Sequence, residues 1–289
     1  MRLAVPGVTV GHWTDAVGQT GCTVIRLPEA TVASGEVRGG APASREFALL
    51  DPTRLVGAVD AVVLSGGSAF GLAAADGVMR ELVAEERGFP TAHGPVPIVV
   101  ALALYDLGVG RADVFPDAEA GASAIASATD SPAVGRIGAG TGAMVGKWRG
   151  PEFAKPGGLG IVNVQRGDLA LTAIVATNAA GDIDDGTTVQ AVLDGSFDSW
   201  PDRESFGTNT TIGLVVTNAA LDKVGCRLVA EGAHDGLARA VTPPHMRSDG
   251  DAFVSAATGV VEAHVDDVRL MAVVAVEQAV RESVGSIEG

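Results

Sequence analysis

The chain has 289 residues, which is enough for one large domain or two and for a substantial buried core. Hydrophobic residues make up 47% of the chain and charged residues 19%, proportions that indicate a packed globular protein and exclude a disordered one. The net charge of −15 and the scattered Lys and Arg residues argue against a nucleic-acid or anionic-membrane partner, because both require clustered positive charge.

The start of the chain, the hydropathy and the cysteines together predict a cytoplasmic protein. Residues 1–7 lack the apolar segment of a signal peptide, and no apolar run reaches the roughly eighteen residues of a membrane span. Cys22 and Cys226 are the only cysteines, and apolar residues close to each in the sequence predict buried thiols in a reducing compartment. A disulfide between them is the less favoured alternative.

The first half of the chain predicts strands and two helices. Apolar or alternating runs bounded by glycines predict strands at 8–10, 22–25 and 60–64. Apolar side chains at helical spacing predict helices at 69–87 and 118–128. Another apolar run, 97–104, lies between the two helices and ends just before Tyr105, the only tyrosine.

The second half predicts a hairpin, a long loop and a strand followed by helices. A glycine-dense loop at 135–147 precedes hairpin strands at 157–164 and 169–177. Residues 182–208 are rich in Asp, Gly and Ser and include Pro201, and a loop of that length inside a compact domain tends to be functional. A buried strand is expected at 212–217, with helices at 219–239, from 252 and at 268–281. The whole chain therefore predicts one α+β domain with helices packed on both sides of central sheets.

The junction between the long loop and the strand at 212–217 is the first candidate site. Thr210 and Thr211 lie at the mouth of this strand, which is a rigid place to present a hydroxyl. Local sequence alone favours the simpler interpretation that both are ordinary strand threonines.

Two glycine turns resemble catalytic motifs but lack residues that those motifs require. A phosphate-binding loop ending at Lys147 would need Gly in place of Thr141 and a hydroxyl in place of Trp148. A hydrolase nucleophile elbow at Ser68 would need Gly in place of Phe70, so a tight turn with a capping serine is favoured. Gly67 or Ser68 would still lie at a helix N-terminus, where N–H groups can hold an anion or a carbonyl oxygen.

The sequence predicts neither a metal nor another cofactor. None of the five histidines has a metal-ligand spacing to another histidine or to a cysteine pair; they are His12, His93, His234, His245 and His264. In isolation, Asp249 and Asp251 predict a turn in which Asp251 caps the helix that follows.

Five motifs carry a family resemblance that covers nearly the whole chain. They are DAVVLSGGSAFGLAAADGV at 60–78, GAGTGAMVGK at 138–147, GGLG at 157–160, NAAGDI at 178–183 and NTTIG at 209–213. In this order they resemble the P1 peptidase family, which contains the L-aminopeptidase/D-esterase-amidases, the β-peptidyl aminopeptidases and the nylon-oligomer hydrolases. The resemblance implies a four-layer αββα sandwich similar to N-terminal-nucleophile hydrolases but with its own connectivity.

The resemblance also implies a precursor that cuts itself at Asn209–Thr210. Residues 1–209 and 210–289 would then form a large and a small chain of one domain, and these would stay together and assemble into a homo-oligomer. Serine is the usual nucleophile of the aminopeptidase branch, so a threonine favours the nylon-hydrolase branch. The implied site consists of Thr210 as nucleophile, Asn178 as the oxyanion-side amide, Lys147 and Tyr105 as lining residues, and Asp249 and Asp251 as the acidic pair.

The chemistry of such a site agrees with the residue types. A threonine at a new N-terminus carries its own base, an α-amine with a pKa of about 7.7–8.0. We therefore predict a metal-free, self-processing amidase or peptidase for small amide or peptide substrates, with Tyr105, Gly67 and Ser68 near the substrate. The alternatives are an acyltransferase of the ornithine-acetyltransferase type and an uncleaved homologue that acts as a binding protein.

Overall fold

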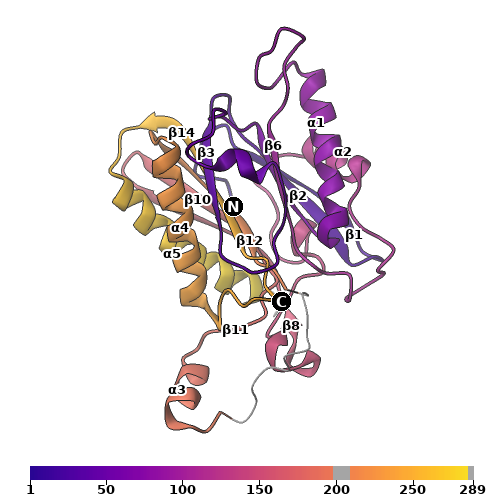
Figure 1. Ribbon diagram of the computed structural model, residues 1–289, viewed down its shortest axis with the longest axis vertical. Helices are drawn as coiled ribbons and strands as arrows, with labels where there is room; N and C mark the ends of the chain where they lie inside the picture. The colour runs from indigo at the N-terminus through magenta and orange to yellow at the C-terminus, as the bar shows by residue number, and fades with distance from the viewer. Residues whose placement is uncertain (198–208, 286–289) are drawn as a thin grey trace.

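The computed structural model describes residues 1–197 and 209–285, which form two five-stranded sheets stacked between two pairs of helices. Figure 1 shows α4 and α5 on the left, α1 and α2 on the right, and the two sheets between them. The order of layers is therefore helix, sheet, sheet, helix, and the predicted αββα sandwich is confirmed.

The first sheet has the strand order β1-β2-β5-β6-β4. Its central pair, β5 and β6, is parallel, and the other neighbours are antiparallel. The strands are β1 (Thr9–Asp15), β2 (Thr20–Arg26), β5 (Ala61–Ser65), β6 (Val99–Ala103) and β4 (Ala43–Arg45). The helices α1 (Ala74–Ala84) and α2 (Ala118–Ala126) pack on its outer face in one hydrophobic cluster.

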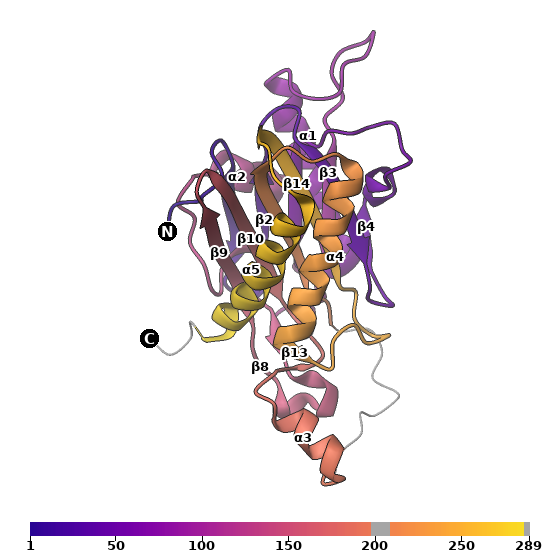
Figure 2. The same ribbon diagram turned by 90° about the vertical axis from the view of Figure 1, so that its left-hand side faces the viewer.

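The second sheet has the order β3-β14-β12-β10-β9, with β12 and β14 parallel at its centre. The strands are β3 (Val32–Val37), β14 (Ala252–Val261), β12 (Ile212–Ala219), β10 (Leu169–Thr177) and β9 (Gly158–Arg166). Its outer face is covered by α4 (Lys223–Ala240) and α5 (Val265–Gly285), which lie side by side in Figure 2.

The main core lies between the two sheets. On β12, Ile212, Leu214 and Val216 face this inner core, whereas Val215 faces α4 and α5. This alternation is the two-residue period of a strand. Both faces of the strand are covered, which is why 212–217 reads as a continuous apolar run. Burial of one such side chain contributes about 1.5–3 kcal/mol to stability.

Short strands and 3-10 helices make up part of the connecting segments. The two-residue strands are β7 (Met144–Val145), β8 (Lys155–Pro156), β11 (Asp182–Ile183) and β13 (Val241–Thr242). The 3-10 helices are η1 (Phe47–Leu50), η2 (Ser68–Ala73), η3 (Gly138–Gly140), η4 (Lys147–Arg149) and η5 (Pro151–Phe153).

Several expectations from the sequence need correction. The helix expected from residue 252 is wrong, because this segment is β14. Its alanines, which favour a helix, are small enough for a strand packed between two layers, and Phe253 faces the outer helices. The helix expected over 69–87 begins as the 3-10 helix η2, and α1 itself starts at Ala74. Gly67, and not Ser68, is the N-cap of η2, and no side-chain hydrogen bond caps it.

The long segment 182–208 is only partly a loop. It contains β11 and the helix α3 (Thr187–Asp194), which projects from the sandwich in Figures 1 and 2. Residues 198–208 of the predicted loop lie outside the described residues. Cys22 and Cys226 are both buried and free, so the thiol interpretation is confirmed and the disulfide alternative is wrong. Across the described residues, every helix is too short or too polar to cross a membrane.

Candidate active site

The mouth of β12 is tied to its two neighbouring strands by backbone hydrogen bonds. Thr210 N donates to the carbonyl oxygen of Asn178, which follows β10, over 2.9 Å. On the other side, Gly250 N donates to the Asn209 carbonyl oxygen over 3.1 Å, just before β14 begins. Thr210 is only 4% exposed, so its side chain is held in a buried, ordered place.

The Thr210 hydroxyl lies against the peptide bond that precedes it. Thr210 Oγ1 donates to the Asn209 carbonyl oxygen, the same oxygen that receives the N–H of Gly250. A Cβ atom on Gly250 would lie 2.7 Å from Thr210 Oγ1, so glycine is needed for this close approach. A backbone N–H aimed at a carbonyl oxygen is the arrangement that stabilises the oxyanion formed in acyl transfer.

Asn178 links the nucleophile candidate to Lys147 and to the first sheet. The amide is fully buried, and its Oδ1 accepts from Lys147 Nζ at 2.8 Å and from Met144 N at 2.9 Å. Its Nδ2 donates to the carbonyl oxygen of Tyr105, beyond the end of β6, at 2.9 Å. The amide group is thus fixed in one orientation, and Tyr105 contributes through its backbone.

Lys147 has an unusual charge state for a lysine. Burial lowers the pKa of its ammonium to about 7, although the carboxylates of Asp249 and Asp106 act in the opposite direction. A large fraction of Lys147 is therefore neutral near pH 7, as a general base requires.

Asp249 and Asp251 hold the backbone around Thr210. Asp249 accepts from Ala180 N at 3.1 Å and from Met246 N at 2.9 Å. Burial, and then the charge of Asp251, raise the pKa of Asp249 well above its usual value. Both aspartates lie at the site. Among the described residues, however, neither aspartate forms a hydrogen bond with the Thr210 hydroxyl. Asp251 is also not a helix cap, because β14 follows it.

Asp251 is bonded on both carboxylate oxygens. Its Oδ1 accepts from Thr211 N at 2.7 Å, and its Oδ2 lies 2.9 Å from His245 Nδ1. The acidic pair therefore sets the geometry of residues 210–211 and 249–251 through the backbone.

Gly67 and Ser68 are engaged within the protein. Gly67 N donates to Asp106 Oδ1 at 2.7 Å, and Ser68 N donates to the Leu104 carbonyl oxygen at 2.8 Å. These are the N–H groups that we expected to hold an anion or a carbonyl oxygen. Substrate binding by Gly67 and Ser68 stays a prediction, and these hydrogen bonds do not support it.

Sequence reasoning missed three residues of this region. Asp106 is buried, accepts a second hydrogen bond from Thr20 Oγ1 at 2.7 Å and acts electrostatically on Lys147. Its position directly after Tyr105 was the available signal. Gly250 stands between the two predicted aspartates. His245 had no local signal, because its contact with Asp251 depends on the turn between them.

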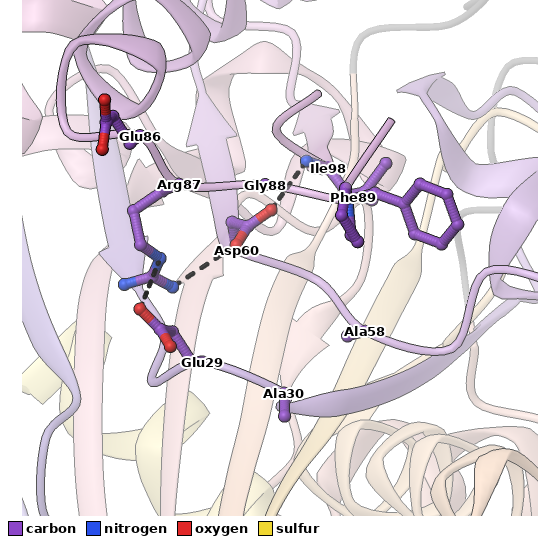
Figure 3. A pocket seen from close by; sticks show the side chains of 10 residues that line it. Glu29, Ala30, Ala58, Asp60, Glu86, Arg87, Gly88, Phe89 and Ile98 are labelled. Carbon is purple, nitrogen blue, oxygen red and sulfur yellow. Dashed lines mark hydrogen bonds and ion pairs between the residues drawn. The ribbon is translucent and has the colours of Figure 1, made fainter. Parts of the chain in front are cut away.

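A cavity of about 350 Å³ lies away from these residues, at the other end of the first sheet. Figure 3 shows Arg87 in it, between Glu29 at 3.8 Å and Asp60 at 3.3 Å. Asp60 precedes β5, whereas Gly67 follows it, so the length of the strand separates the cavity from the contact between Gly67 and Asp106. The cavity at Arg87 thus lies apart from Thr210 and its neighbours. We choose Thr210 and its neighbours as the candidate site because of their hydroxyl, amine and carboxylate groups, and not because of cavity size.

The layers define the fold class: an αββα sandwich with an Ntn-hydrolase-like fold. The L-aminopeptidase D-Ala-esterase/amidase of Ochrobactrum anthropi, described as a variant of that fold, has a similar structure with a TM-score of 0.74. It is 21% identical, and the match covers 98% of this chain and 85% of the other.

The chain belongs to Peptidase family S58, whose model matches residues 3–288. An uncharacterized aminopeptidase of Mycobacterium leprae is 39% identical over 290 residues, covering 90% of this chain and 78% of the relative. A 6-aminohexanoate-oligomer endohydrolase of Agromyces sp. is 30% identical over 283 residues, covering 89% and 75%. The resemblance drawn from the motifs is thus confirmed, and the chain is a hydrolase that acts on amide bonds.

Proposed function

We propose that this chain is a self-processing amidase or peptidase whose nucleophile is the hydroxyl of Thr210. One observation carries the proposal: Thr210 Oγ1 and Gly250 N both donate to the carbonyl oxygen of Asn209. A hydroxyl placed on a polarised carbonyl is the starting geometry for attack on that carbonyl.

Self-cleavage proceeds by acyl transfer from nitrogen to oxygen. Thr210 Oγ1 forms a bond to the Asn209 carbonyl carbon while its proton passes to a base, and neutral Lys147 is the base that we assign. The Gly250 N–H holds the resulting oxyanion. The bond between the carbonyl carbon and Thr210 N then breaks as that nitrogen takes a proton, leaving an ester that water hydrolyses.

Cleavage gives the nucleophile its own base. The new α-amine of Thr210 starts 2.9 Å from the Asn178 carbonyl oxygen, which also lies 3.4 Å from Lys147 Nζ. An α-amine has an unperturbed pKa of about 7.7–8.0, so it is available as a base near neutral pH. The same oxyanion donor then serves external amide substrates.

The substrates that we propose are small peptides or short linear amides. Relatives named as an aminopeptidase and as an endohydrolase of 6-aminohexanoate oligomers support this range, since both names describe cleavage of amide bonds. We further propose that the two chains stay together after cleavage and assemble as a homo-oligomer.

The test is the covalent state of the purified protein. Intact-mass measurement should find a fragment that begins at Thr210, and a denaturing gel should show two bands. Thr210→Ala should remain one folded chain without activity, whereas Thr210→Ser should retain some cleavage because it keeps a hydroxyl. A wild-type chain that stays full-length after long incubation contradicts the proposal.

A further inference from the structure

His245 has a backbone conformation that a histidine adopts rarely. Its φ is 53°, in the left-handed region, and it lies in the turn between β13 and Asp249. Side chains other than glycine remain there only where the surroundings hold them, and such residues cluster at functional sites. The contacts of the ring show what holds it.

The His245 ring lies between a buried histidine and a buried carboxylate. Its Nδ1 is 2.9 Å from Asp251 Oδ2, and its ring makes a T-shaped contact with the His234 ring, with 4.9 Å between the ring centroids. His234 is itself fully buried and is fixed by a contact of 3.0 Å between its Nε2 and the Glu36 carbonyl oxygen of β3. His245 is thus supported from the edge of the second sheet.

Asp251 connects His245 to the backbone next to the candidate nucleophile Thr210. Its other carboxylate oxygen accepts the N–H of Thr211 at 2.7 Å, and Asp251 is only 2% exposed. The Thr211 N–H belongs to the peptide plane that leaves Thr210, so its direction sets the backbone of Thr210 and the direction of its hydroxyl. Without His245, one buried carboxylate oxygen would lose its donor, and Asp251 would no longer be held in one rotamer.

We propose that His245 is a positioning residue for the reaction at Thr210, acting through Asp251. The inference rests on the proposed function of Thr210. It assigns His245 no contact with the substrate and no part in proton transfer.

Two substitutions separate the hydrogen bond from the backbone strain. His245→Gly removes the ring and accepts a φ of 53° without penalty. His245→Asn also tolerates this region and places its Nδ2–H where the histidine carries Nδ1, so it can restore the donor to Asp251. The rate of self-cleavage is measured on freshly synthesised chain by pulse–chase, which needs no external substrate, and thermal unfolding is followed in parallel.

We expect His245→Gly to slow self-cleavage about 10- to 100-fold, the range for losing a hydrogen bond to a charged group. His245→Asn should recover most of the rate. The thermal midpoint of His245→Gly should stay well above the assay temperature, so that unfolding does not account for the slower self-cleavage. Unchanged cleavage in His245→Gly overturns the inference, and so does an equal loss in both variants at equal stability.

Thr210→Ala in the same assay tests the nucleophile role of Thr210 separately from the positioning role of His245. Cleavage that persists in Thr210→Ala overturns the nucleophile assignment itself. Cleavage that is lost in Thr210→Ala but normal in His245→Gly overturns only the role of His245.

Discussion

At the scale of single residues, a partly buried lysine and a buried aspartate with opposite pKa shifts belong to the candidate site. Burial lowers the pKa of Lys147 to about 7, and burial together with Asp251 raises the pKa of Asp249. Titratable groups whose environments bring them near neutral pH are the usual acids and bases of a site. Lys147 is the better candidate for the base of self-cleavage, because both carboxylate oxygens of Asp249 already accept backbone N–H groups.

Lys147→Arg should abolish self-cleavage although it keeps the positive charge. An arginine does not lose its proton in the accessible pH range, so the base is removed, a loss of about 10²–10⁴-fold. In the wild type, the cleavage rate should rise with pH through about 7, since Lys147 is active when deprotonated. Pulse–chase at a series of pH values measures both effects.

The neighbouring residue Arg149 offers a matched control on the same short helix. Its guanidinium pairs with Asp182, and this ion pair does not involve Asn178, so Arg149→Lys should cleave normally. Cleavage at the wild-type rate in Lys147→Arg rules out Lys147 as the base.

At the scale of the element, the mouth of β12 distinguishes two adjacent threonines. Thr210 Oγ1 lies on the Asn209 carbonyl, whereas the buried Thr211 Oγ1 has no hydrogen-bond partner within 1–197 and 209–285. Successive side chains of an extended segment point to opposite faces, which accounts for the difference. Thr211 therefore serves the site through its N–H, which Asp251 accepts.

Thr211→Val should still cleave and should be at least as stable as the wild type. Valine has nearly the same shape as threonine and removes a buried hydroxyl without a partner, a gain of up to about 1 kcal/mol. Chemical denaturation and the two-band pattern on a denaturing gel check the two outcomes. A valine variant that remains uncut would show that the Thr211 hydroxyl takes part in the reaction.

The sequence predicted most elements and indicated candidate site residues, but it did not predict the contacts between distant segments. The hairpin β9–β10, the strand β12 and the helices α1, α2, α4 and α5 follow from apolar periodicity. The strand β14 could not be predicted from this periodicity, because a strand covered on both faces and rich in alanine has the same apolar pattern as a buried helix. The contacts of Asp106 with Gly67 and of His245 with Asp251 arise only when separate turns meet.

At the scale of the whole molecule, the site joins the ends of strands from both sheets. Tyr105 and Asp106 follow β6 of the first sheet, whereas Asn178, Thr210 and Asp251 lie at the ends of β10, β12 and β14 in the second. The hydrogen bond from Asn178 Nδ2 to the Tyr105 carbonyl oxygen crosses between the sheets. Packing of the two sheets is thus a condition for the site, and a local fragment would not form it.

The strand order of the second sheet has a consequence for the refolding of the enzyme. Cleavage before Thr210 would leave β12 and β14 on the small chain, with β10 on one side of this pair and β3 on the other, both on the large chain. After complete denaturation, the cleaved protein must therefore regain its native state in a second-order reaction, while uncut Thr210→Ala refolds in a first-order one. Formation of the second sheet, followed before any oligomer assembles, should therefore depend on protein concentration in the cleaved form and not in uncut Thr210→Ala.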